Sequence, residues 1–259
     1  MKNTDGDSQN IDIRIEKRKK KNNINRIIRK VVLTIIILVV VFFLLKYAGA
    51  FNVKNVNITG NENTEVEDII AAGQIEKGAS YFSFAGKKAR ESIEKLPYVK
   101  TAKITFLPFA PVKISIVERK PLFQGVYNGK FYLIDEELRV LDEKNMYNPE
   151  LFTLENVEFE NYPVGSFLFG TEDRQKAEFL FEIFKNERLK PLIGIVSLKD
   201  DMAEITTKDG IKLVFGPYEN TAYKLKVLAK VMDDVASKGI VADTVYLNKG
   251  PNPILETKN

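Results

Sequence analysis

The stretch V-V-L-T-I-I-I-L-V-V-V-F-F-L-L, from Val31 to Leu45, decides how this chain is organised. Thr34 is its only polar residue. Extended to Phe51, the segment has about 21 residues and would form a helix of about 31 Å, enough to cross a bilayer. Lys46 can extend its ammonium group to the lipid headgroups, and Tyr47 suits the membrane interface. We therefore predict a transmembrane helix over residues 31–51.

A cleavable signal peptide is the alternative interpretation of this segment. Ala48-Gly49-Ala50 has the small-x-small form of a cleavage site. The polar segment that precedes the apolar run is, however, as long as a whole ordinary signal peptide. That length favours an uncleaved anchor over cleavage after Ala50.

The cluster of basic residues lies on the N-terminal flank of the apolar run. The topology signal that we identify consists of Lys17, Arg18, Lys19, Lys20, Lys21, Arg29 and Lys30. By the positive-inside rule, residues 1–30 are cytoplasmic and residues 52–259 lie outside the membrane. Residues 1–30 are otherwise polar and predict a disordered tail. No aromatic residue interleaves the basic run to stack on bases, so we expect no nucleic acid as a partner.

The composition excludes several classes of function. The chain contains no Cys and no His, so it can form no disulfide, no thiolate nucleophile and no imidazole-based catalytic relay. Residues 48–259 carry 28 Lys/Arg against 31 Asp/Glu, and the net charge of +4 therefore comes from the N-terminus. Any catalysis would depend on carboxylates, Lys, Tyr or Ser.

Residues 52–120 predict a small domain with the order β-α-α-β-β. A strand leads to Gly60, and Thr64 with Glu67 has the spacing of a capping box at the start of a helix. A second helix over residues 86–96 ends at Pro97. Residues 99–106 and 112–116 predict two strands joined by a turn rich in Pro and Phe.

Residues 121–248 predict a second domain, an antiparallel sheet with helices on one face. Short strands are expected at residues 131–134, 151–154, 193–198, 203–206, 211–215 and 241–247. Two helices have apolar stripes at helical spacing, the first made of Ala177, Leu180, Phe181 and Phe184, the second of Leu225, Leu228, Ala229 and Met232. Residues 249–259 are expected to be disordered. The fold class is thus α+β, preceded by one transmembrane helix.

The sequence contains only weak candidates for catalytic or metal-binding motifs. Ser92-Ile93-Glu94-Lys95 matches S-x-x-K of penicillin-interacting serine enzymes, but no Lys-Thr-Gly accompanies it. The acidic pairs Asp200-Asp201 and Asp233-Asp234 are adjacent residues whose side chains point apart. We predict no catalytic residue, no metal or cofactor site and no small-molecule substrate. The alternative is a membrane-anchored extracytoplasmic hydrolase that uses two carboxylates.

Ordered motifs along residues 31–250 resemble the bacterial cell-division family FtsQ/DivIB. The first domain looks like the POTRA domain of that family. The motifs are F-N-V-K-N-V-N-I-T-G from Phe51 to Gly60, Pro97-x-Val99-x-x-Ala102, Pro111 to Ile114, Glu118 to Pro121, Tyr132 to Asp135, Asp209 to Gly216 with Lys224, Leu225 and Leu228, and Val241 to Tyr246. Glu137-Leu138 stands where the family usually has Gly shortly after the Asp.

The resemblance implies a non-enzymatic scaffold of the divisome, located in the cell membrane at the division septum. Its partners in that family are FtsL and FtsB, called DivIC in Gram-positive bacteria, and the partner adds a strand beside the terminal strand of the second domain. We predict that strand at residues 241–247, with Tyr246 as its aromatic anchor. The expected partner-binding residues are Val241, Asp243, Val245, Tyr246 and Leu247.

An outer-membrane assembly factor is a second alternative to the scaffold. A POTRA domain can also be the chaperone module of an outer-membrane assembly factor. That class of protein carries a C-terminal series of alternating strands of about 10 residues, which this sequence lacks. The scaffold is therefore the favoured function.

Overall fold

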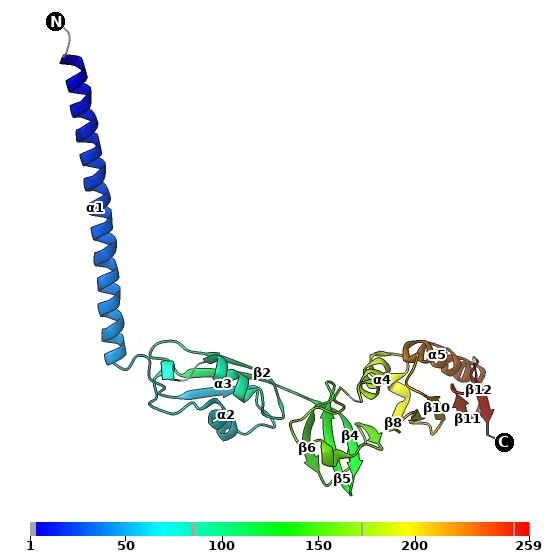
Figure 1. Ribbon diagram of the computed structural model, residues 1–259. Coiled ribbons are helices and arrows are strands. Elements are labelled where there is room, and N and C mark those ends of the chain that lie inside the picture. The colour runs from blue at the N-terminus through cyan, green and yellow to red at the C-terminus, as the bar shows by residue number, and fades with distance from the viewer. Residues whose placement is uncertain (1–3, 84–85, 172, 251, 259) are drawn as a thin grey trace. The chain divides into compact units, whose positions relative to one another are not determined.

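The computed structural model describes residues 4–83, 86–171, 173–250 and 252–258, with the description of residues 4–23 and of Ser83 limited to the backbone (Figure 1). Contacts within the chain define two compact units, which are described separately. The first unit comprises the chain up to Asn57 with segments 75–85 and 105–113. The second comprises segments 58–74 and 86–104 and all residues from 114 onward.

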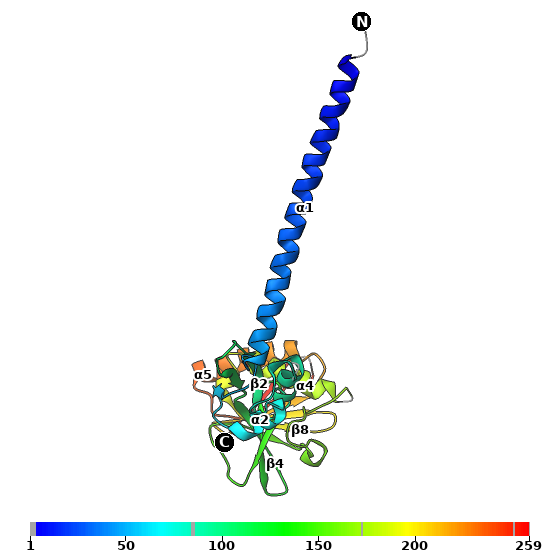
Figure 2. The same ribbon diagram turned by 90° about the vertical axis from the view of Figure 1, so that its left-hand side faces the viewer.

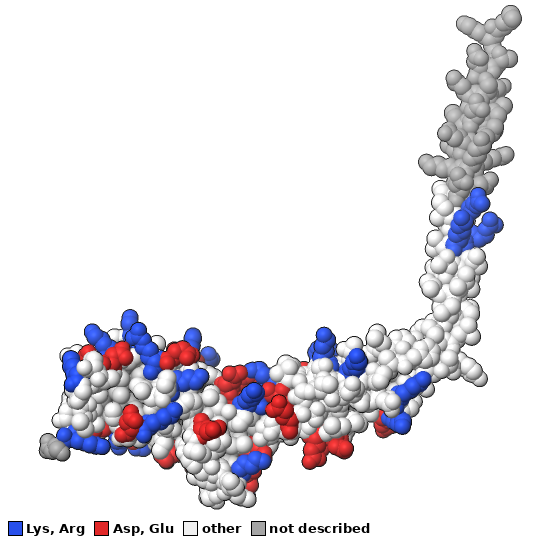
Figure 3. Space-filling view, turned by 180° about the vertical axis from the view of Figure 1, so that it is seen from behind, with Lys and Arg blue, Asp and Glu red and all other residues white. Residues whose placement is uncertain are grey.

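The first unit begins with a single long helix, α1 (Thr4–Tyr47). Its segment Ile24–Tyr47 is long and apolar enough to cross a membrane, and Figure 3 shows the described part of α1 as white below a cluster of Lys and Arg. The predicted apolar helix is present, but it ends at Tyr47 and not at Phe51, because residues 48–50 form a turn. The predicted disorder of residues 1–30 is wrong for residues 4–30, which continue α1. Lys, Arg and Glu are good helix formers, so this polar segment extends the helix already nucleated by the apolar run.

Main-chain hydrogen bonds hold the chain that follows α1 to the other segments of the first unit. Val53 N–H donates to the carbonyl of Ala79 at 2.9 Å, and Gly78 N–H donates back to Val53 at 2.7 Å. Phe109 N–H donates to the carbonyl of Ala50, also at 2.9 Å. The short 3-10 helix η1 (Tyr81–Ser83) therefore lies in a segment tied to the end of α1.

The smaller sheet has the strand order β1-β3-β2. Along the chain its elements are β1 (Val56–Thr59), α2 (Val66–Gly73), α3 (Gly86–Ile93), β2 (Val99–Thr105) and β3 (Val112–Glu118). This is the predicted β-α-α-β-β order. The capping box is not formed, because α2 begins one residue after Glu65 without a side-chain cap. The Glu118 carboxylate instead accepts the backbone N–H groups of Asn63 and Thr64, each at 2.8 Å.

These contacts make stability depend on the charge of Glu118. Burial raises the pKa of Glu118, but hydrogen bonds from residues 63 and 64 outweigh burial and leave the pKa below its ordinary value. The stabilisation is therefore complete above the ordinary Glu pKa of about 4.3 and is lost as pH falls through the lowered folded-state pKa. We expect the urea midpoint of Glu118→Gln to fall less between pH 6 and pH 3 than the wild-type midpoint, because the variant has no carboxylate at this position to protonate. Equal slopes in the two proteins would contradict the role of Glu118.

Among the described residues, the larger sheet has nine strands in the order β12-β11-β10-β9-β8-β7-β4-β5-β6. The strands are β4 (Pro121–Tyr127), β5 (Lys130–Asp135), β6 (Val140–Lys144), β7 (Phe152–Glu155), β8 (Ile193–Leu198), β9 (Ala203–Thr207), β10 (Lys212–Gly216), β11 (Ala242–Tyr246) and β12 (Ile254–Thr257). The sheet is mixed, whereas the sequence predicted an antiparallel one. β7 runs parallel to β4 and β8, and β10 runs parallel to β11. A helix connects β10 to β11, and a crossover of this kind joins parallel strands.

Two helices cover one face of this sheet, α4 (Arg174–Lys185) and α5 (Thr221–Lys238), as Figures 1 and 2 both show. The predicted stripe of α5 is buried throughout. The predicted stripe of α4 is partly wrong, because Phe181 is 46% exposed and Phe179 is fully buried in its place. Phe179 packs edge-on against Phe215 of β10, with ring centroids 4.7 Å apart.

Candidate functional site

The last two strands form one end of the larger sheet. β12 pairs antiparallel with β11, with Thr244 opposite Glu256 and Tyr246 opposite Ile254. β12 ends the strand order, so within the described chain no strand pairs with its outer edge. The outer edge of β12 therefore presents main-chain donors and acceptors to an added strand.

The predicted edge strand is one position away from the edge. Residues 242–246 form β11, and β12 covers them, so the expectation of a disordered tail over residues 249–259 is wrong for Ile254–Thr257. β12 is ordered because it pairs with β11. The sequence of its four residues does not by itself predict that pairing. Val245 and Leu247 are buried, whereas Val241 and Asp243 are exposed. The role of these residues in partner binding stays a prediction.

Tyr246 is engaged within the chain. Its hydroxyl donates to the Glu256 carboxylate of β12 at 3.2 Å, and the Lys249 ammonium lies 3.3 Å from the centre of its ring. The side chain is half-buried. Tyr246 thus supports the pairing of β11 with β12, and any contact with a partner would involve its remaining exposed surface.

The opposite end of the sheet differs in chemistry. β6 carries Asp142, Glu143 and Lys144, and these side chains make ion pairs: Lys144 with Asp142, and Lys130 of the neighbouring strand with Glu143. Charged side chains on an edge strand discourage the addition of another strand. β12 carries one charged residue, Glu256, with Ile254, Leu255 and Thr257. Of the two edges, β12 is the better suited to accept a partner strand.

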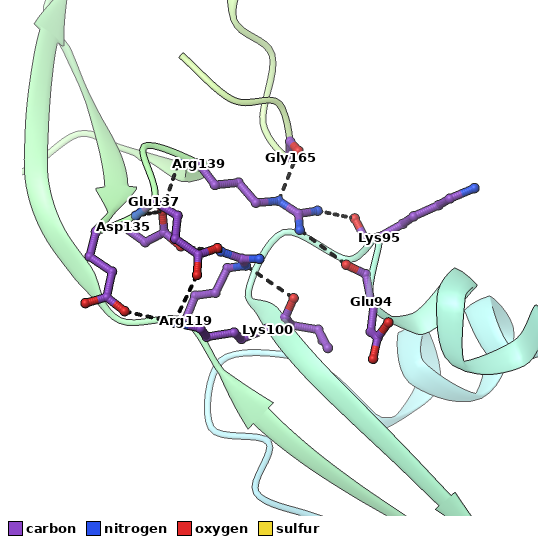
Figure 4. A network of polar contacts seen from close by, with 10 residues as sticks. Glu94, Lys95, Lys100, Arg119, Asp135, Glu137, Arg139 and Gly165 are labelled. Carbon is purple, nitrogen blue, oxygen red and sulfur yellow. Dashed lines mark hydrogen bonds and ion pairs between the residues drawn. The ribbon is translucent and has the colours of Figure 1, made fainter. Parts of the chain in front are cut away.

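A buried ion-pair network lies where β3, β4 and the turn between β5 and β6 meet (Figure 4). The Arg119 guanidinium pairs with Asp135 at 2.5 Å and with Glu137 at 2.7 Å, and Arg119 and Asp135 are only 8% and 2% exposed. The other oxygen of Asp135 accepts the backbone N–H groups of Glu137 and Arg139. Asp135 therefore orders the turn after β5 and neutralises a buried cation at the same time.

Arg139 continues this network toward α3 (Figure 4). Its guanidinium donates to the carbonyls of Glu94 and Lys95, just past the end of α3, and to the carbonyl of Gly165. A cation at a helix C-terminus is favourable because the last carbonyls are unpaired there. Burial and the neighbouring charge of Arg119 lower the pKa of Arg139. Two residues of this network, Arg119 and Asp135, lie in family-like motifs, and their pairing was not predicted.

The residues considered for catalysis do not assemble into a site within the described chain. Asp233 pairs with Arg188 and Asp234 with Lys238, all on the surface, and the Asp200 side chain is fully exposed. Searched over the residues that the structure describes, no group of three or more His, Cys, Asp or Glu could hold a metal ion. The acidic pairs are solvated surface residues.

Comparison with known proteins supports a cell-division family. The POTRA domain of the FtsQ type matches residues 51–119. Cell division protein DivIB of Clostridium botulinum (strain Hall) is 31% identical over 125 residues, which cover 48% of this chain and 49% of that protein. Cell division protein DivIB of Clostridium acetobutylicum is 29% identical over 80% of this chain and 75% of that protein, and DivIB of Clostridium tetani is 26% identical over 80% of each.

The matched region thus spans about half the length of the Clostridium botulinum relatives and more of the other two. Among solved structures, the major extracytoplasmic domain of DivIB from Geobacillus stearothermophilus aligns with 45% of this chain and 96% of that domain, at 13% identity and a TM-score of 0.27. The relationship rests on the sequence matches. Residues 51–119 thus match an FtsQ-type POTRA domain, and the chain is similar in sequence to the DivIB cell-division proteins of these bacteria.

Proposed function

We propose that this protein is a non-enzymatic, single-pass membrane scaffold of the bacterial divisome, which binds partners of the FtsL and FtsB/DivIC type and supports septum formation. The observation that carries the proposal is the combination of an apolar helix, an FtsQ-type POTRA domain and a sheet whose last strand has an unpaired edge within the described chain. This combination suits a protein that holds others at the membrane.

The proposed topology follows from charge. Arg26, Arg29 and Lys30 lie at the start of the candidate span, and the run from Lys17 to Lys21 precedes it. The positive-inside rule assigns this side to the cytoplasm. The POTRA domain and the larger sheet then lie outside the membrane, where they can meet the external domains of other single-pass proteins at the septum.

The proposed partner site is the free edge of β12. Lys258 N–H donates to the carbonyl of Val241 at 3.0 Å, and successive N–H groups of a strand point to opposite sides. The N–H of Thr257 therefore points away from β11, toward the position of an added strand. Main-chain hydrogen bonds would hold that strand, and exposed side chains such as Ile254 would select it.

Replacement of Thr257 by Pro tests this site. Proline removes the outward N–H and leaves the N–H groups that face β11 in place. We expect Thr257→Pro to lower partner capture by about tenfold, since one hydrogen bond contributes about 1 kcal/mol and the ring also obstructs the added strand. The measurement is affinity capture from detergent-extracted membranes, with quantitative mass spectrometry of the captured proteins.

Thr257→Val is the matched control, because it keeps the N–H and the branched shape of the side chain. It should capture two small single-pass proteins as wild type does. Equal capture by Thr257→Pro would show that the partners bind elsewhere. Retention of a cell-wall fragment or a soluble substrate in place of membrane proteins would overturn the scaffold function itself.

A further inference from the structure

Aromatic side chains connect α1 to two later segments of the first unit. The Phe82 ring lies 6.3 Å from Phe42 and 5.2 Å from Phe51, measured between centroids. Phe106 lies 6.4 Å from Phe51 and stacks on Tyr81 at 4.2 Å. Segment 75–85 therefore packs against the last part of the candidate membrane span, and segment 105–113 packs against Phe51, shortly after that span ends.

The depth of Phe42 in the membrane determines the depth of Phe82. About 20 helical residues cross the hydrocarbon core. Counted from Val31 they reach Ala50, and counted from Ile24 they reach Phe43, so Phe42 lies within the core in both placements. The second placement would bury Arg26, Arg29 and Lys30 in the hydrocarbon, and the first would bury the irregular backbone after Tyr47. Residues 31–47 avoid both, and their length of about 17 residues still suffices to cross the core. Phe42 then lies about 8 Å along the helix from the boundary between hydrocarbon and headgroups, in the leaflet at which α1 ends.

Three large apolar side chains near this boundary are exposed. Phe82 is 60% exposed, Leu107 is 60% exposed and Phe109 is 53% exposed. The Phe109 backbone is bonded to Ala50, directly after α1. The Lys54 ammonium lies 5.6 Å from the centre of the Phe109 ring, and a Lys beside an inserted aromatic side chain can reach lipid phosphates.

We propose that Phe82, Leu107 and Phe109 insert into the phospholipid leaflet at which α1 ends, and so bind the first unit to the membrane surface. The occupant of this apolar surface is lipid, since the surface is continuous with a helix that itself contacts lipid. Interfacial side chains of this kind reach about 5–10 Å into the boundary between headgroups and acyl chains. The inference rests on the membrane crossing of α1 and is independent of which proteins bind β12.

The sequence contains no Trp, so one introduced Trp reports on one position. The full chain is reconstituted into vesicles of phosphatidylcholine and phosphatidylglycerol that contain doxyl-labelled lipid and no other protein. We expect Phe82→Trp and Phe109→Trp to lose a several-fold larger fraction of their emission than Tyr223→Trp, an exposed position on α5. A doxyl group close to the headgroup should quench both more than one at the bilayer centre.

Phe43→Trp, an exposed position within the span, reports on insertion of α1. If Phe43→Trp is quenched while Phe82→Trp and Phe109→Trp match Tyr223→Trp, the membrane crossing stands and the lipid contact is wrong. If Phe43→Trp is not quenched either, both the crossing and the lipid contact are wrong. Quenching of Phe82→Trp and Phe109→Trp with the shallow label supports lipid insertion directly, because the vesicle holds no other protein.

Discussion

Replacing Arg119 by Met lowers the free energy of unfolding by about 3 kcal/mol. Removal of one partner from a buried ion pair typically costs about 3–5 kcal/mol, since the other charge stays buried and unpaired. Asp135 is 2% exposed and loses its guanidinium partner, but it keeps the N–H donors of Glu137 and Arg139. These remaining hydrogen bonds place the expected loss at the low end of the range. The measurement is a urea titration of the detergent-solubilised chain, followed by far-ultraviolet circular dichroism.

The neighbouring Lys120 provides the control, because it is exposed. Lys120→Met should change the free energy of unfolding by less than about 0.5 kcal/mol. The double variant Arg119→Met, Asp135→Asn should be less destabilised than the sum of its single variants, since Asn carries no charge to leave unpaired. Additive losses would mean that Arg119 acts through packing alone.

Phe179→Ala is expected to lower the free energy of unfolding by about 3–5 kcal/mol, as for other fully buried Phe residues. The Phe179 ring holds α4 to the sheet through Phe215 and also meets Tyr218, with ring centroids 5.4 Å apart. Its truncation leaves a cavity that the rigid sheet beneath cannot fill. The same urea titration measures this loss.

Phe181→Ala is matched in chemistry, helix and change of volume, and differs in burial. Phe181 is 46% exposed, so its truncation should cost about 1 kcal/mol or less. Similar losses in the two variants would contradict the observed orientation of α4. The pair also tests directly whether helical spacing or tertiary packing identifies the buried face.

The sequence predicted most elements of the larger sheet but not their arrangement. The strands β4, β6 and β12 were not foreseen, and neither was the edge position of β12. The parallel contacts of β7 with β4 and β8 and of β10 with β11 were also missed, because they join strands that other elements separate along the chain. Strand propensity depends on the neighbours that a strand packs against. Four residues such as Ile254–Thr257 become a strand because β11 offers them a partner.

At the candidate site, too, the sequence predicted the residues but not their arrangement. The terminal strand of the sheet was expected to bind the partner, and the residues of β11 were identified, yet the chain continues by one more strand and moves the edge to β12. The Arg119–Asp135 pair joins residues 16 positions apart and was likewise absent from the prediction. No local sequence pattern shows that Arg119, and not Lys120, is the buried partner of an ion pair. Tertiary packing decides which of the two side chains is buried.

The sequence by itself determined the apolar helix, the absence of Cys and His chemistry, the β-α-α-β-β order and the resemblance to cell-division proteins. The first three depend on composition or on local periodicity, and the resemblance depends on ordered motifs. A chain carries all of these whatever its tertiary contacts. Only the tertiary structure decided which strand ends the sheet, which Phe of α4 is buried, and which exposed aromatic side chains lie beside the end of α1. These features depend on contacts between different segments of the chain, and such contacts contribute to stability only after the chain has folded.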